Sequence, residues 1–211
     1  MPKKPKFTKE EVINAAYEII KEEGLENLAA RGLARKLNSA CSPIFTLFSS
    51  MEEVKEEVYK KAKKDFVNEL KESLDYFPIF KEFGLRFVNY AVKNPKLFIM
   101  LFGPKYLINM EQFLIDFNDI IDPIIKGIEK TFGLNSEDSN YLFYQMITNA
   151  NGMAIFMITG KKNYSEEEIG KYLSELCIGL VLIIKAKENK LDVQMAQNLA
   201  KSIDIMPVKI K

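Results

Sequence analysis

The sequence predicts an all-α protein with a small N-terminal domain of three helices, at residues 1–50, followed by a larger helical domain at residues 51–211. Hydrophobic residues make up 47% of the 211 residues, which is enough to bury a core and excludes a disordered chain. The chain has only 10 glycines and 8 prolines, a composition that favours helices over many short strands. Apolar residues recur at helical spacing, and no segment shows sustained period-two alternation.

The charge balance and the absence of histidine narrow the possible functions. With 30 basic and 29 acidic residues the formal net charge is +1, so any basic surface for nucleic acid must be local. The chain has no histidine, which removes the commonest metal ligand and the commonest general base. The sequence also lacks a nucleotide-binding glycine loop, a nucleophile motif and paired carboxylates in an apolar setting. We therefore expect no enzyme activity, no metal and no cofactor.

The cysteines and the apolar segments bear on the compartment. Cys41 and Cys177 are far apart and lack the spacing of a metal site, which favours a reducing environment. The longest strongly apolar run, Cys177–Ile184, is interrupted by Gly179 and is too short to span a bilayer. We expect a cytoplasmic protein without a membrane partner.

Three short helices are predicted within the first fifty residues. Thr8-Lys-Glu-Glu11 matches a capping box, and Gly24 suits the end of the helix that follows it. A second helix is predicted at about residues 28–37, a turn at Asn38-Ser39, and a third helix from Ser42-Pro43 that places Ile44, Phe45 and Phe48 in the core. This order fits a helix-turn-helix, in which the third helix enters the major groove of DNA. On periodicity alone, a generic three-helix subdomain fits equally well.

Longer helical patterns follow the N-terminal domain. The first begins at Ser49-Ser50-Met51-Glu52-Glu53 and continues to about Tyr76. Acidic N-terminal caps are predicted at Asn135–Asp138 and at Tyr164–Glu168. The last residues, 206–211, are expected to be frayed. Further helices are predicted at about residues 79–92, 96–102, 105–117, 118–132, 136–158, 165–187 and 192–203.

Three segments of the first sixty residues resemble the TetR family of transcriptional regulators. Phe7–Leu28 resembles the family's first helix and the loop after it, Arg31-Gly-Leu-Ala-Arg-Lys-Leu37 its second helix, and Ile44-Phe-Thr-Leu-Phe-Ser-Ser-Met-Glu-Glu-Val54 its third helix and the start of its fourth. The resemblance covers about residues 7–59 in unbroken order. Weaker similarities follow at residues 87–102 and 151–160. The resemblance implies a helix-turn-helix domain followed by a helical ligand-binding and dimerisation domain.

The DNA-binding positions depart from the family pattern. The family usually has a threonine where this chain has Pro43, and a tyrosine where it has Phe45. It usually has a histidine or tyrosine at the position of Leu47, and a lysine at the position of Met51. No charged residue lies between Leu37 and Met51, although phosphate contacts need donors or positive charge. Two interpretations stay open. In the first, operator DNA is bound through a set that includes the N-terminal arm, the second helix and the third helix: Lys6, Arg31, Ser42, Pro43, Phe45, Thr46 and Lys55.

In the second interpretation, the chain is a ligand-binding or protein-interaction dimer whose degenerate helix-turn-helix no longer binds operator DNA. Phe45 and Phe48 are then core residues, and Leu47 with Met51 forms an apolar patch for a protein partner. The first interpretation predicts a regulator, in most cases a repressor, that binds double-stranded DNA as a dimer and is released by a small effector.

Two groups of apolar residues are assigned to the larger domain. An aromatic and methionine-rich group suits an adaptable pocket for a small hydrophobic effector: Phe98, Phe102, Met110, Phe113, Phe117, Phe143 and Met146. At any single position, ordinary core packing is the more frequent explanation. Two apolar stripes at helical spacing are implied by the resemblance to form a homodimer interface: Tyr144, Asn151, Ile155, Tyr172, Leu176, Leu180 and Ile183.

Overall fold

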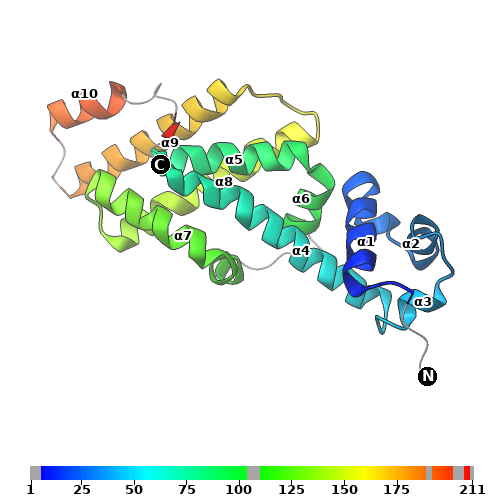
Figure 1. Cartoon of the computed structure of the whole chain (residues 1–211). Helices are drawn as coiled ribbons and strands as arrows, with labels where there is room; N and C mark the ends of the chain where they lie inside the picture. The colour runs from blue at the N-terminus through cyan, green and yellow to red at the C-terminus, as the bar shows by residue number, and fades with distance from the viewer. Residues whose placement is uncertain (1–5, 104–109, 189–191, 202–206, 210–211) are drawn as a thin grey trace. The chain divides into compact units, whose positions relative to one another are not determined.

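The computed structural model describes residues 6–103, 110–188, 192–201 and 207–209, apart from the side chains of 110–116, 193, 195 and 199. Helices form almost all of this part of the chain (Figure 1). The α-helices are α1 (Lys9–Glu23), α2 (Ala30–Lys36), α3 (Ser42–Phe45), α4 (Met51–Lys71), α5 (Ile79–Lys93), α6 (Pro95–Phe102), α7 (Met110–Phe132), α8 (Ser136–Ile158), α9 (Glu166–Lys187) and α10 (Val193–Lys201). Two 3-10 helices and two short strands complete the fold: η1 (Leu25–Asn27), η2 (Glu72–Asp75), β1 (Tyr76–Phe77) and β2 (Val208–Lys209).

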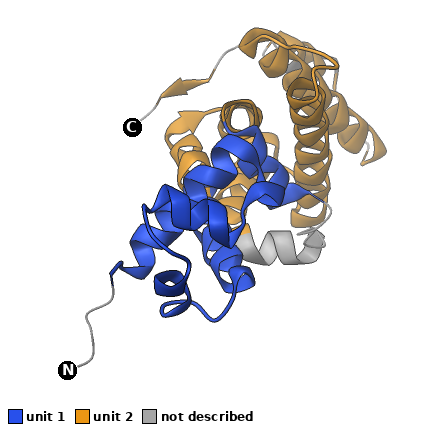
Figure 2. Cartoon of the chain, turned by 90° about the vertical axis from the view of Figure 1, so that its right-hand side faces the viewer, with its two compact units in different colours: residues 1–66, 94–109 blue, residues 67–93, 110–211 orange. Residues whose placement is uncertain are grey.

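The chain divides into two compact units (Figure 2). Unit 1 comprises residues 1–66 and 94–109, and unit 2 comprises residues 67–93 and 110–211. This division differs from the predicted boundary at residue 50 for two reasons. Most of α4 packs with the N-terminal helices, and α6 packs against α1 although it lies beyond α5 in the sequence.

Unit 1 begins with the capped helix that the sequence predicts. The Thr8 hydroxyl accepts the Glu11 amide at 3.1 Å, and the Glu11 carboxylate accepts the Thr8 amide at 2.7 Å, so the capping box is confirmed. Gly24 ends α1 with a φ of 100°, a conformation that side chains disfavour, and its amide bonds to the Ile20 carbonyl. The buried face of α1 packs on α2, η1 and α6.

Unit 2 is organised around α5. Nine of its residues are buried, from Phe80 to Ala91, and they point to more than one side of the helix. Helices α7, α8 and α9 pack around α5, and α8 also packs on α7 and α9. Asn135 caps α8 and Ser165 caps α9, as the sequence predicts. At the far end of α9, the buried Lys185 donates a 2.7 Å hydrogen bond to the Gly133 carbonyl just after α7.

Helix α7 corrects one prediction. A break was expected at residues 117–118, but the helix is continuous from Met110 to Phe132. The buried residues Phe117, Ile121 and Ile124 keep helical spacing across the expected break. Pro123 lies inside the helix on its exposed side, so the carbonyl that it leaves without a partner, that of the exposed Asp119, faces water.

The prediction that the chain contains no strand is also wrong. β1 and β2 pair antiparallel, with Tyr76 opposite Lys209 and Phe77 opposite Val208. Residues 207–209, which were expected to be frayed, are therefore held in place. Two paired residues are too few to produce an alternating pattern in the sequence, which explains why the strands were missed.

Candidate nucleic-acid interface, cavity and helix face

The helix-turn-helix of unit 1 consists of α2, the turn at Asn38-Ser39 and α3. The turn is tight: Asn38 adopts a positive φ of 49°, and the Ser39 amide bonds back to the Ala34 carbonyl at 2.9 Å. Ile44 and Phe48 lie four residues apart, are 0% and 2% exposed, and anchor α3 to the core. The core assignment of Phe48 is confirmed.

The outer side of α3 carries Ser42, Phe45 and Thr46, all exposed. The assignment of Phe45 to the core is wrong, because its side chain is 44% exposed. Phe45 follows directly after the anchoring residue Ile44 and so points away from the core. Pro43, Leu47 and Met51 are half-buried, so they do not form a freely exposed patch.

The predicted basic contacts have different surroundings. Arg31 and Arg35 lie one turn apart on α2 and are exposed, and their guanidinium groups make no hydrogen bond or ion pair within the described part of the chain. Lys6 is exposed and lies on the turn, where its ammonium donates to the Asn38 carbonyl at 3.3 Å and the Ser39 hydroxyl at 3.1 Å. Lys55 forms a 2.8 Å ion pair with Glu52, and its side chain is only 15% exposed.

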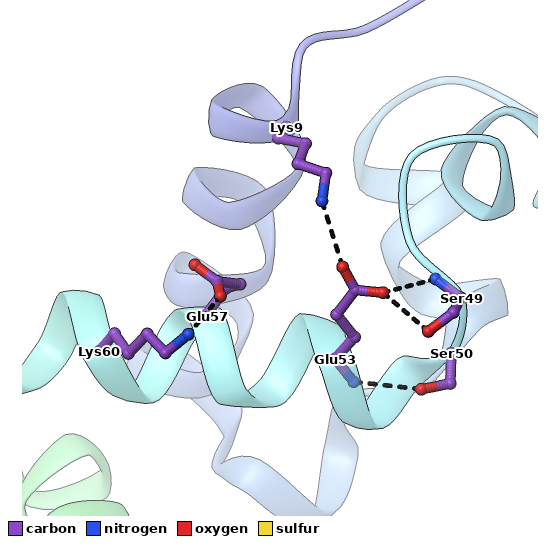
Figure 3. Close-up of polar contacts among 6 residues, drawn as sticks. All are labelled: Lys9, Ser49, Ser50, Glu53, Glu57 and Lys60. Carbon is purple, nitrogen blue, oxygen red and sulfur yellow. Dashed lines mark hydrogen bonds and ion pairs between the residues drawn. The ribbon is translucent and has the colours of Figure 1, made fainter.

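Glu53, at the start of α4, forms an ion pair with Lys9 of α1 (Figure 3). The Glu53 carboxylate accepts the amide of Ser49 at 2.6 Å and the ammonium of Lys9 at 3.1 Å, while the Ser50 hydroxyl caps the Glu53 amide at 3.2 Å. The hydrogen bond from the Ser49 amide, followed by those from the Ser49 hydroxyl and Lys9, lowers the pKa of Glu53 to about 2. The carboxylate is therefore charged at neutral pH, and Lys9 is held on it over the Phe48 ring.

An apolar cavity lies among α5, α7, α8 and α9 of unit 2. Its volume is only about 10 Å³, roughly the space of one water molecule, and its lining offers no charged side chain. Gly84 of α5 lies against Leu173 of α9 so closely that a Cβ there would overlap Leu173 Cδ1. Phe83 and Phe143, which both line the cavity, pack against each other with ring centroids 5.8 Å apart. The lining residues are Phe80, Phe83, Gly84, Ile124, Phe143, Met146, Ile147, Ala150 and Leu173.

Two of the predicted effector residues, Phe143 and Met146, line this cavity. Phe98 and Phe102 belong to α6 in unit 1, where the Phe102 ring contacts Phe98 and Phe66. Phe117 is buried in unit 2 but is not part of the lining. The side chains of the remaining two, Met110 and Phe113, lie outside the described residues.

Sequence reasoning missed the contribution of α5 to this cavity. Phe80 and Phe83 were not selected because aromatic residues occur throughout the chain. The sequence does contain one signal: Gly84 falls among the apolar residues of a helix, between Phe83 and Leu85, and an isolated glycine in such a position marks the close approach of a neighbouring element.

The outer face of α8 and α9 is apolar and open. None of the seven predicted interface residues is buried: Ile155, Tyr172 and Ile183 are 39%, 38% and 53% exposed, and the others are half-buried. A Cβ placed on Gly152 or Gly179 would meet no atom within 4 Å. A groove of about 590 Å³ runs along this face and is lined by Gln145, Thr148, Asn149, Gly152, Met153, Phe156, Tyr164, Tyr172 and Leu176.

The described part of the chain shows neither a metal site nor a membrane-spanning helix. No three acidic or cysteine side chains there gather in the manner of a metal site. No helix within the same residues is long and apolar enough to cross a membrane.

The chain has an all-α fold in which a helix-turn-helix in one unit accompanies a second helical unit. It is similar to the crystal structure of a TetR-family transcriptional regulator from Streptomyces coelicolor, with a TM-score of 0.61 over 92% of this chain and 87% of that one. The two sequences are 11% identical, so the similarity establishes the fold. No family model and no curated protein matches the sequence. At the level of fold, the resemblance identified from residues 7–59 is confirmed.

Proposed function

We propose that this chain is a dimeric transcriptional regulator that binds operator DNA through unit 1 and is released by a small hydrophobic effector. The observation that carries the proposal is the shared fold with a TetR-family regulator over 92% of the chain, including a complete helix-turn-helix. We expect it to act as a repressor, because an effector that stabilises a second conformation removes the protein from DNA.

The DNA contacts in this proposal come from α2, from α3 and from Lys6, which precedes α1. Arg31 and Arg35 present two unpaired guanidinium groups beside the turn, suited to phosphate oxygens. The exposed Lys6 ammonium lies on the turn, where it donates to the Asn38 carbonyl and the Ser39 hydroxyl. In the complex it would donate to a phosphate oxygen instead, and water could then bind the two groups that it leaves. The outer side of α3, with Ser42, Phe45 and Thr46, then faces the bases.

The effector site in this proposal is the cavity of unit 2. A volume of about 10 Å³ holds no effector, so ligand binding requires the surrounding helices to separate. An effector that fits only the expanded arrangement shifts the equilibrium by its difference in affinity for the two arrangements. The apolar lining favours a small, neutral, hydrophobic molecule.

The homodimer is proposed to form through the outer face of α8 and α9. A face with Ile155, Phe156, Tyr172 and Ile183 exposed is unfavourable in water and favourable in a symmetric interface. The open space at Gly152 allows the helices of a second copy to approach closely. A dimer also presents two α3 helices to two half-sites of one operator.

A second candidate function is a ligand-responsive dimer that contacts proteins rather than DNA. Several lysines in the described part of unit 1 are already paired with carboxylates: Lys9 with Glu53 at 3.1 Å, Lys36 with Glu22 at 3.2 Å, Lys55 with Glu52, Lys60 with Glu57 and Lys61 with Asp65. Since no charged residue lies between Leu37 and Met51, few cations remain for the DNA backbone.

Binding to the DNA upstream of the protein's own gene separates the two candidates. Fluorescence anisotropy is measured with that duplex and with a scrambled duplex of the same composition, at low and at physiological salt. A preference for the upstream duplex that persists at physiological salt establishes operator binding. Equal binding to both duplexes that disappears with salt refutes it, because contacts to phosphates alone carry no sequence information. The variant Arg31→Ala should weaken binding to both duplexes alike, and Lys130→Ala, in unit 2, serves as the control.

A further inference from the structure

The outer side of α3 is nearly free of hydrogen-bond donors. The Thr46 hydroxyl donates to the Pro43 carbonyl at 2.7 Å, which commits its proton to the helix itself. The Cys41 thiol lies 3.5 Å from the Ala30 carbonyl and is directed to the protein. Ser42 alone on this side retains a hydroxyl without a partner among the described residues. The surface is otherwise apolar, and its largest group is the ring of Phe45.

Apart from the Ser42 hydroxyl, which can both donate and accept a hydrogen bond, such a surface distinguishes the four bases in one way. Recognition of guanine in the major groove uses arginine or lysine, and recognition of adenine uses asparagine or glutamine. None of these residues occurs in the segment from Ser39 to Ser50, and Asn38 lies in the turn before α3 rather than on α3 itself. The only apolar group that any base pair presents in the major groove is the 5-methyl group of thymine. An exposed aromatic ring on a recognition helix has no other base group to bury.

We infer that Phe45 is the specificity-determining residue of this protein and that it recognises the 5-methyl group of a thymine in each operator half-site. The inference rests on the proposed function and adds to it the class of operator: a half-site whose centre is read by apolar contact with thymine rather than by hydrogen bonds to guanine. Arg31 and Arg35, on the preceding helix, hold the phosphates and fix the register of α3.

The size of the effect follows from the group that is buried. Removing one methyl group from a well-packed apolar contact weakens binding about fourfold. Two half-sites in one dimer give a loss of roughly fifteenfold when both methyl groups are removed.

The test begins with selection of duplexes from a random pool by the full-length protein at physiological salt. Each thymine of the enriched sequence is then replaced by uracil, which keeps the base pair and lacks only the methyl group. We expect one thymine per half-site at which uracil weakens binding about fourfold. The variant Phe45→Ala should bind thymine and uracil duplexes equally at that position. The variant Phe77→Ala, which removes a phenylalanine of similar exposure in unit 2, should keep the full difference.

Each remaining outcome overturns the inference in a distinguishable way. Enrichment of a sequence at which no uracil substitution matters leaves operator binding intact and refutes the role of Phe45. An effect of uracil that persists in Phe45→Ala assigns the methyl contact to another residue. If the wild-type protein enriches no sequence at all, both this inference and the proposed operator binding fail. The circular dichroism spectrum of Phe45→Ala shows whether the variant is folded, which the exposure of Phe45 leads us to expect.

Discussion

Replacing Leu173 by alanine tests whether the cavity of unit 2 is as tightly closed as its geometry indicates. Leu173 is fully buried, and its Cδ1 atom occupies the space that the missing side chain of Gly84 leaves free. A buried leucine-to-alanine change costs about 2–5 kcal/mol, and the cost rises with the volume of the cavity that remains. No neighbour can fill the gap here, because Gly84 has no side chain and the existing cavity already adjoins it. We therefore expect the upper part of that range, about 3–5 kcal/mol.

The assay is thermal unfolding, followed by circular dichroism at a fixed protein concentration because a dimer couples stability to concentration. For a chain of this size a loss of about 3–5 kcal/mol lowers Tm by roughly 6–20 °C. Val92→Ala, on the same α5 but 42% exposed in the wild-type protein, should change stability by less than about 0.5 kcal/mol. Benzene should raise the Tm of Leu173→Ala and leave that of the wild-type protein unchanged, because only the variant has room for it. A loss below about 1 kcal/mol, or equal stabilisation of both proteins by benzene, would refute the closed cavity.

Three further predictions concern other parts of the molecule. Glu53→Gln should lower Tm at pH 7. Because hydrogen bonds from Ser49, and to a smaller extent from Lys9, lower the pKa of Glu53 to about 2 from its ordinary 4.5, the difference in Tm from wild type should shrink as pH falls from 4.5 towards 2; a constant difference would contradict the lowered pKa. Iodoacetamide should modify Cys41 in the folded protein and leave Cys177 intact until the protein unfolds, because Cys177 is buried and burial raises the pKa of its thiol to about 12. Mass spectrometry of the peptides identifies the modified thiol. Ile183→Glu should raise the dissociation constant of the proposed dimer at least about a hundredfold, measured by analytical ultracentrifugation. Lys130→Glu is the control, and a stable Ile183→Glu dimer would place the interface elsewhere.

Local signals in the sequence predicted the helix ends well. The capping boxes at Thr8 and Ser165 and the cap at Asn135 each involve residues three positions apart, so the sequence contains the complete interaction. Helix α7 was predicted less well because the effect of Pro123 depends on the side of the helix on which it lies. A proline on the solvent side leaves its carbonyl partner exposed to water, and only the packed structure reveals that orientation.

The candidate sites depended on contacts that a sequence does not contain. Phe98 and Phe143 have the same chemistry, yet one packs in unit 1 and the other lines the cavity of unit 2. The course of the chain decides this, since α6 returns to α1 after α5. Phe45, the last residue of α3, and Phe48, three residues beyond it, likewise have the same side chain. Phe48 lies four residues after the buried Ile44 and is itself buried, whereas Phe45 directly follows Ile44 and is exposed. The apolar residues of α8 and α9 were recognisable in the sequence because they repeat at helical spacing over long helices, and their role as a dimer interface stays a prediction.

The pairing of β1 with β2 bears on the order in which unit 2 folds. It joins Tyr76 to Lys209, at the end of the described chain, so the paired residues are 133 positions apart in the sequence (209 − 76). Contacts of this kind carry the largest loop-closure entropy and follow the packing of the intervening helices. The amide hydrogens of this ribbon, whose residues Phe77 and Val208 are exposed, should therefore be the last to gain protection during refolding. They should also be the first to exchange in the native protein, well before those of α5.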